Sequence, residues 1–242
     1  MSSDSAEVPA LHADEPHEGG VASRLNWLRA GVLGANDGIV STAGIVIGAV
    51  GATSDRSAIV IAGVAGLAAG AMSMGAGEYV SVSTQRDSEL ALLAKERREL
   101  RDEPDEELAE LAGIYVEKGL DEELALEVAV ALTKKDALGA HAEAELHINP
   151  DDISNPWNAS AASTISFTIG ALLPLLTMTL ASPDIRIWLT VVSVVVALAI
   201  TGWTSARFGY SSPRRAVLRN VLGGLFAMAV TYGIGTILGT QV

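Results

Sequence analysis

Five long apolar stretches constrain this chain more than any other feature, because each contains roughly the 20 residues needed to cross a lipid bilayer. The last three carry no charged side chain, and the first two carry one acid each, Asp37 and Glu78. This pattern predicts an all-α, multi-pass membrane protein with five transmembrane helices. The predicted spans are Ala30–Val50, Ser57–Val82, Ala159–Leu180, Ile187–Ala206 and Asn220–Val242.

Pairs of glycines four residues apart recur within these stretches. In a water-soluble helix each glycine would cost about 1 kcal/mol relative to alanine. In lipid, small residues instead let helices approach one another closely. The glycines therefore favour membrane helices; the pairs are Gly34/Gly38, Gly44/Gly48, Gly66/Gly70 and Gly235/Gly239.

The charge of the chain is segregated. Of the 29 acidic residues, 20 lie between Arg86 and Asp152, and only Asp184 follows Ile153. The formal net charge of −13 argues against nucleic-acid binding. The absence of cysteine excludes disulfides and thiolate metal sites. We therefore expect an acidic insert within an apolar membrane protein.

Four segments follow from this pattern. Residues 1–23 are polar and acidic, which predicts a disordered cytoplasmic tail, and they lack the pattern of a signal peptide. Residues 24–85 hold the first two spans, 86–152 form the acidic helical insert, and 153–242 hold spans three to five.

Arginines gather on one side of the predicted helices. Two precede the first span and four lie between the fourth and fifth spans: Arg24, Arg29, Arg207, Arg214, Arg215 and Arg219. The links on the opposite side hold only Arg56 and Arg186. Because positive loops stay in the cytoplasm, the N-terminus and the insert are predicted to be cytoplasmic.

The insert is predicted to contain three helices. The first, Arg86–Asp102, continues the second span, and Pro104 begins the next helix. Gly119 ends that helix, and Asp121 caps a third that runs to about Leu146.

Two spans carry candidate functional residues. Asp37 is a functional candidate because a buried acid costs several kcal/mol unless it is compensated, and its neighbour Asn36 is polar. Met74 and Glu78 are four residues apart, so both lie on one helical face. A thioether beside a carboxylate suits a borderline divalent metal better than Mg²⁺. The alternatives are an Asp37 that is protonated or paired for packing, and a methionine that only packs.

The insert carries pairs of metal-ligating residues, each pair on one helical face: Glu96 and Glu99, Glu107 and Glu110, and His141 and Glu145. Converging from three helices, such pairs would suit Fe²⁺, Mn²⁺ or Zn²⁺. The alternative is a set of solvated acidic helices with nearby arginines as surface partners. The spacing leaves both open. No nucleophile–base pair, phosphate-binding glycine loop or HExxH motif is present, so no enzymatic activity is expected.

Two motifs are similar to those of a known family. They are Arg29–Ser41, which reads RAGVLGANDGIVS, and Ala62–Ser81, which reads AGVAGLAAGAMSMGAGEYVS. Together they resemble the vacuolar iron transporter family, and the resemblance extends over nearly everything after residue 24.

The resemblance implies a homodimer of five-helix protomers that moves Fe²⁺, and often Mn²⁺, out of the cytosol in exchange for protons. It places Asp37 and Met74 on the pathway. It also implies a cytoplasmic metal-binding domain whose glutamates match Glu96, Glu99, Glu107, Glu110 and Glu145.

The chain departs from the family pattern at two places. Some plant members carry a glutamate where this chain has Gly66, and a glycine where it has Glu78. They also have a methionine pair where this chain has His141 and Ala142, which predicts a harder and more pH-sensitive metal preference in the insert.

The expected function is export of iron(II), and of manganese(II) in second place, with protonation of Asp37 releasing the ion. No permanently bound cofactor is expected: Fe²⁺, Mn²⁺ or Zn²⁺ would be substrate, and protons and the lipid bilayer the other partners. The expected location is a bacterial plasma membrane, or a vacuolar membrane in a eukaryote. The alternatives are a membrane-anchored iron sensor or buffer and a di-iron enzyme, although a di-iron centre needs Glu-x-x-His pairs on two helices.

Overall fold

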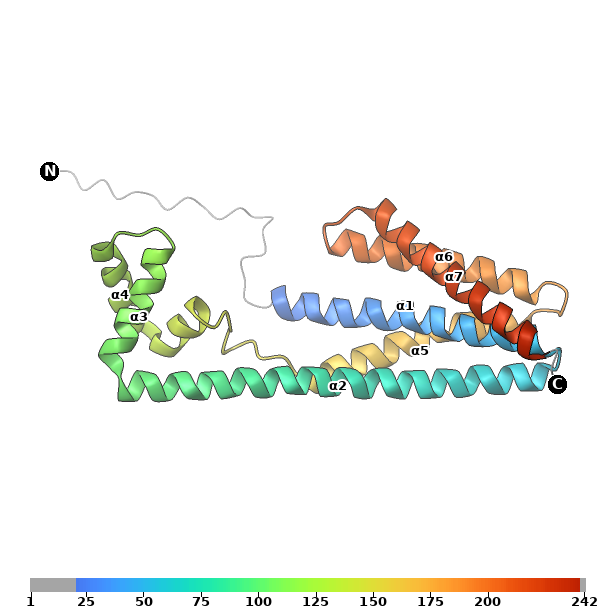
Figure 1. Cartoon of the computed structure of the whole chain (residues 1–242), viewed down its shortest axis with the longest axis horizontal. Coiled ribbons are helices and arrows are strands. Elements are labelled where there is room, and N and C mark those ends of the chain that lie inside the picture. The colour runs from blue at the N-terminus through green and yellow to red at the C-terminus, as the bar shows by residue number, and fades with distance from the viewer. Residues whose placement is uncertain (1–20, 240–242) are drawn as a thin grey trace. The chain divides into compact units, whose positions relative to one another are not determined.

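The computed structural model describes residues 21–239, with side chains from residue 29 onward. Within these residues the protein is all-helical, with seven helices and no strand (Figure 1). The predicted tail over residues 1–23 lies outside the described part except for its last three residues, with which α1 begins.

Between residues 21 and 239, five helices are long and apolar enough to cross a membrane, which agrees with the predicted number of spans. The chain is therefore a multi-pass membrane protein. These helices are α1 (Val21–Ala52), α2 (Arg56–Asp102), α5 (Pro156–Leu180), α6 (Arg186–Phe208) and α7 (Pro213–Gly239). The last three residues of the predicted fifth span, 240–242, lie outside the described part.

The chain forms two compact units. One, here the membrane unit, takes Asn26–Ser88 and the chain from Ser154 onward. The other, here the insert unit, takes Glu89–Ile153. Helix α2 contributes its apolar part to the membrane unit and its charged part to the insert unit.

Glycines bring the helices of the membrane unit close together. A Cβ atom on Gly34 would lie 2.7 Å from the carbonyl oxygen of Ser163 in α5. A Cβ atom on Gly48 would lie 3.1 Å from the carbonyl oxygen of Thr231 in α7. Helix α1 can therefore pack backbone to backbone on both neighbours, as the paired glycines predict.

The membrane unit has apolar side chains both in its buried core and on its exposed outer faces. The largest buried cluster joins α1, α2, α5, α6 and α7 through residues such as Val46, Leu198 and Met228. Large apolar side chains on the outer faces stay exposed, among them Trp188 and Phe226, both 72% exposed. Apolar side chains on the outside are expected where lipid replaces water.

The insert unit adds α3 (Pro104–Glu117) and α4 (Glu122–Ala144) to the end of α2. Pro104 stands in the first turn of α3, where its missing N–H costs nothing. The Asp121 carboxylate caps α4 by accepting a hydrogen bond from the backbone N–H of Leu124 at 3.0 Å. Both helix starts agree with the prediction.

The end of α3 also agrees with the prediction. Gly119 has a positive φ of 103°, a conformation that glycine adopts without a Cβ penalty. The N–H of Gly119 donates to the carbonyl of Val116, and the N–H of Leu120 donates to that of Tyr115. These two bonds satisfy the last carbonyls of α3 and stop the helix.

Helix α4 differs from the single continuous helix that the sequence predicts. Asp136 has φ −163° and ψ 93°, so two helical segments meet there. Figure 1 shows the last turns of α4 turning away from its first part.

Candidate functional site

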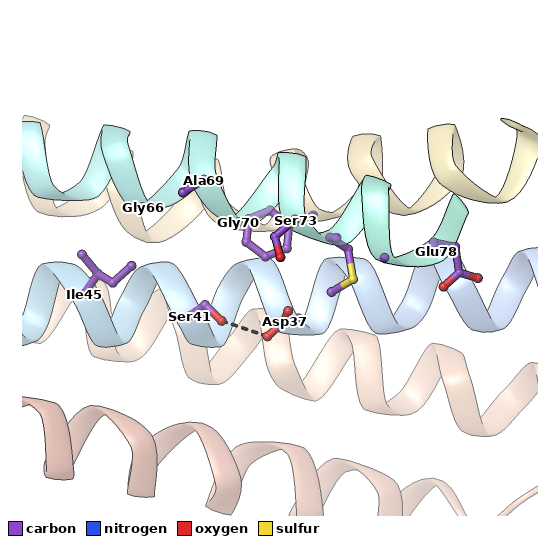
Figure 2. Close-up of a pocket in the computed structure, with 11 residues that line it drawn as sticks. Asp37, Ser41, Ile45, Gly66, Ala69, Gly70, Ser73 and Glu78 are labelled. Carbon is purple, nitrogen blue, oxygen red and sulfur yellow. Dashed lines mark hydrogen bonds between the residues drawn. The ribbon is translucent and has the colours of Figure 1, made fainter. Parts of the chain in front are cut away.

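An open cavity of about 560 Å³ lies in the membrane unit, between α1, α2 and α5 (Figure 2). Helix α1 contributes one face with residues four apart, and α2 contributes the stretch from Gly66 to Glu78. That stretch is about 18 Å long at 1.5 Å per residue. The lining residues are Asp37, Ser41, Ile45, Gly66, Ala69, Gly70, Ser73, Met74, Gly77, Glu78 and Phe167.

Asp37 is half-buried in this cavity and is oriented by its own helix. The hydroxyl of Ser41, one turn further along α1, donates a hydrogen bond to Asp37 Oδ1 at 2.8 Å. The second carboxylate oxygen makes no hydrogen bond among those found in the described residues, so it can accept a proton or a cation.

Three of the four predicted pathway residues line this cavity: Asp37, Met74 and Glu78. The fourth, Asn36, does not, because consecutive helical residues point about 100° apart. Its side-chain oxygen is buried without a hydrogen-bond partner. Met72 also lies off the cavity and is 75% exposed, which makes it a natural control for Met74.

Ser41 and Ser73 are cavity residues that the sequence interpretation did not single out. Serine is common in membrane helices and carries little signal alone. The useful signal was the spacing of four residues from Asp37 to Ser41, which predicts a contact on one helical face.

A second constellation of polar residues lies in the insert unit. Glu96 from α2, Glu107 from α3 and His141 from α4 bring one ligand atom each to within 4.8 Å of one another. His141 is fully buried, and Glu96 and Glu107 are 3% and 6% exposed. Glu145 stands at the edge, with its Oε2 3.9 Å from His141 Nδ1.

The imidazole ring of His141 lies close to the carboxylates of the cluster without a hydrogen bond to them. His141 Nδ1 lies 3.0 Å from Glu96 Oε1 and 3.5 Å from Glu107 Oε2. Both ring nitrogens of His141 and Glu96 Oε1 are nevertheless buried without a hydrogen-bond partner. Buried polar groups are costly unless they are paired or coordinate a metal. The geometry therefore fits a cation among these side chains.

Burial and mutual repulsion change the acidity of the cluster. Burial raises the pKa of Glu96 to about 7, with further contributions from the charges of Glu145, Glu107 and Glu99. Burial and the charge of Glu110 raise the pKa of Glu107, while His141 lowers it. A bound cation would relieve this repulsion.

Two of the six predicted insert ligands lie outside the cluster. Glu99 forms an ion pair with Lys95 at 2.7 Å and raises the pKa of that lysine. Glu110 is exposed. Both are close enough to repel Glu96 or Glu107 electrostatically, so they add negative potential around the cluster.

The two sites offer different donor sets. Carboxylates with one imidazole in the insert suit Fe²⁺, Mn²⁺ or Zn²⁺. The membrane cavity offers two carboxylates, two hydroxyls and one thioether along its length. That set can coordinate a divalent ion stepwise but does not enclose it in one place.

Known proteins resemble this chain over most of its length. Residues 28–236 match the VIT family. A protein of Acanthamoeba castellanii named "Vacuolar iron transporter" is 42% identical over 86% of this chain and 77% of its own length. "Vacuolar iron transporter homolog 5" of Oryza sativa subsp. japonica is 37% identical over 95% and 87%. "Vacuolar iron transporter homolog 2.1" of Arabidopsis thaliana is 33% identical over 93% and 88%.

These matches cover both motifs quoted from the sequence, the cavity of the membrane unit and the whole insert unit. They support metal-ion transport across a membrane as the general activity. The chain belongs to the vacuolar iron transporter (VIT) family.

Proposed function

We propose that this protein moves Fe²⁺, and Mn²⁺ in second place, out of the cytosol in exchange for protons. The observation that carries the proposal is the cavity of the membrane unit, where Asp37, Met74 and Glu78 face one space. A carboxylate within a membrane span is costly, and such residues usually mark ion pathways or proton relays.

The insert unit gathers the substrate in this proposal. Its cluster of Glu96, Glu107, Glu145 and His141 binds the ion from the cytosol, and its acidic surface raises the local cation concentration. The charged part of α2 belongs to the insert unit and its apolar part to the membrane unit. The ion passes from the insert to Glu78 and Met74, and then to Asp37.

Proton exchange is assigned to Asp37. When a proton enters from the far side of the membrane, it neutralises the carboxylate and weakens its hold on the cation. Ser41 holds one oxygen of this carboxylate and leaves the other available. If Asp37→Asn transported at the wild-type rate with an unchanged pH dependence, this step would be wrong.

The remaining features of the proposal follow the family and the arginine pattern. The N-terminus and the insert face the cytoplasm, the protein acts as a homodimer, and its location is the plasma membrane of a bacterium. In a eukaryote the location would be the vacuolar membrane.

Fe²⁺ flux into proteoliposomes tests the proposal. We expect flux that increases with an imposed pH gradient and falls in Met74→Leu. Met72→Leu is the matched control, because Met72 is the same residue type in the same helix but lies off the cavity. Equal flux in both variants would remove Met74 from the pathway, and flux without any response to the gradient would remove proton exchange.

A second candidate is a membrane-anchored iron sensor or buffer, which the convergent cluster of the insert favours by itself. Fe²⁺ binding that requires Glu96, with no flux under any gradient, would establish this alternative. A di-iron enzyme is a weaker candidate, because the cluster contains one histidine and no Glu-x-x-His pair. The relatives quoted above are named as transporters or their homologues, which also favours transport.

A further inference from the structure

We propose that Asp136 is a positioning residue for the insert cluster: it breaks α4 and turns His141 towards Glu96 and Glu107. This inference rests on the proposed metal site of the insert. Asp136 does not belong to the cluster, and its own side chain is exposed.

The helical phase of α4 changes along its length. In its first part, Ala125 and Ala129 are fully buried and mark the inward face. His141 follows Ala125 by 16 residues. In an unbroken helix with 100° per residue, His141 would point about 160° away from Ala125 and about 120° away from Ala129. A continuous α4 would therefore turn His141 away from the inward face.

The observed structure has the opposite arrangement. His141 is 0% exposed, and its neighbours Ala142 and Ala144 are 0% and 6% exposed. The inward face of the last turns is therefore rotated relative to that of the first part. The change occurs at Asp136, whose backbone is not helical.

The side chain of Asp136 stabilises the break in α4. Its backbone is extended, and its Oδ1 accepts a hydrogen bond from the N–H of Gly139 at 3.0 Å. An extended residue whose side chain binds the N–H three positions later is the geometry of a helix N-cap. Asp136 thus starts a new short helix, and that helix carries His141 and Glu145.

Gly139 also contributes to the capped break in α4. A Cβ atom on Gly139 would lie 2.8 Å from Asp136 Cγ and would come even closer to Oδ2. Because residue 139 has no side chain, the Asp136 carboxylate can occupy this space. An alanine at 139 would force the carboxylate to shift and would also favour an unbroken helix.

Chemical labelling of the full-length protein in lipid nanodiscs tests this role without reference to metal. Diethyl pyrocarbonate modifies accessible imidazoles, and mass spectrometry locates the modified residues. In the wild type we expect His141 to be protected and the exposed His147 to react. Asp136→Ala and Gly139→Ala should expose His141 until it reacts like His147.

Metal affinity is the second measurement, made by calorimetry with Mn²⁺ and with Fe²⁺ under anaerobic conditions. Residues that orient metal ligands typically change affinity by about 10–100-fold. We expect a loss in this range for Asp136→Ala and Gly139→Ala. Asp136→Asn should restore protection and affinity, because asparagine caps a helix as well as aspartate does.

Asp121→Ala is the matched control. Asp121 caps the first part of α4 through the same type of bond, to Leu124 at 3.0 Å. Its loss should destabilise the insert without exposing His141 or weakening metal binding. If Asp136→Ala and Gly139→Ala left His141 protected and the affinity unchanged, the proposal would be overturned.

A failure of the metal site itself gives a different result. If the wild type bound neither Mn²⁺ nor Fe²⁺, the proposed metal-gathering role of the insert would be wrong. The labelling of His141 would still test the role of Asp136. His141 exposed only in Asp136→Ala and Gly139→Ala would support that role, and unchanged labelling would contradict it.

Discussion

The two polar constellations of this protein differ in how they arrange their carboxylates. In the insert unit, Glu96, Glu107 and His141 bring their ligand atoms to within 4.8 Å of one another and are almost completely buried. In the membrane unit, Asp37, Met74 and Glu78 are half-buried along the wall of one cavity (Figure 2).

The difference corresponds to two roles that a metal site can have, which are tight binding of an ion and conduction of an ion. A compact, desolvated set of ligands binds a cation tightly, because the cation relieves repulsion among the carboxylates. A pathway needs binding that is strong enough for entry and weak enough for exit, spread over several positions. We therefore expect variants of the two sites to fail in different ways.

The largest effect is expected from Asp37→Asn, which removes the acid from the first span. Fe²⁺ flux into proteoliposomes should fall at least about tenfold, since even residues that only orient a metal ligand change activity by 10–100-fold. Binding of Fe²⁺ to the insert should stay unchanged. Asp184→Asn is the control, because it removes an exposed acid outside the cavity. Wild-type flux in Asp37→Asn would mean that Asp37 is not needed for conduction, which would contradict the different roles proposed for the two sites.

Glu96→Gln should show the opposite behaviour. The metal affinity of the full-length protein should fall by about 10–100-fold, because a buried ligand becomes neutral. Glu110→Gln is the control, since Glu110 is exposed and outside the cluster, and it should change affinity much less. Calorimetry measures both variants. Equal losses of metal affinity in the two variants would mean that the insert attracts cations only through its acidic surface.

The insert should bind metal more weakly in acid. Because the pKa of Glu96 is about 7, protons compete with the metal as the pH falls below 7. Affinity for Mn²⁺ should therefore decrease from pH 7.5 to pH 5.5. A flat profile would contradict the raised pKa, and Glu96→Gln should show a much weaker dependence.

Without metal, the stability of the insert should change in the opposite sense. The folded-state pKa of Glu96 is raised from 4.5 to about 7, so the folded form holds the proton more tightly than the unfolded form. This contribution to the free energy of unfolding is complete below pH 4.5 and is lost as the pH rises towards 7. The urea midpoint for proteolysis within residues 89–153 should fall over this window. Added Mn²⁺ at pH 7.5 should raise it again.

The smallest effect is expected from Ser41→Ala. Hydrogen bonds between side chains in membrane proteins average about 0.6 kcal/mol, which corresponds to roughly a threefold change. Flux should therefore fall by about threefold, because Asp37 loses its hydrogen-bond partner. Ser81→Ala, outside the cavity on the same helix as Met74, should leave the flux unchanged.

The sequence predicted the features that depend on local chemistry. Apolar length indicated the five spans, and Pro104, Gly119 and Asp121 indicated the helix ends of the insert. Each of these signals acts within a few residues, so no knowledge of packing was needed.

The sequence could not predict what depends on packing between helices. The convergence of Glu96, Glu107 and His141 joins three helices, and equally spaced Glu99 and Glu110 lie outside it. The break at Asp136 was missed because an aspartate within a helical pattern looks like an ordinary exposed residue. The pattern of Asp136 followed three residues later by Gly139 was the available signal for an internal cap.

In the proposed mechanism the membrane cavity conducts the ion and the insert gathers it. The most direct test is Fe²⁺ flux as a function of Fe²⁺ concentration, compared between Asp37→Asn and Glu96→Gln in matched proteoliposomes. We expect the flux of Asp37→Asn to stay low at every concentration, whereas Glu96→Gln should recover the wild-type rate at high Fe²⁺. Recovery of Asp37→Asn at high Fe²⁺, together with a Glu96→Gln protein that stays inactive at every concentration, would contradict it.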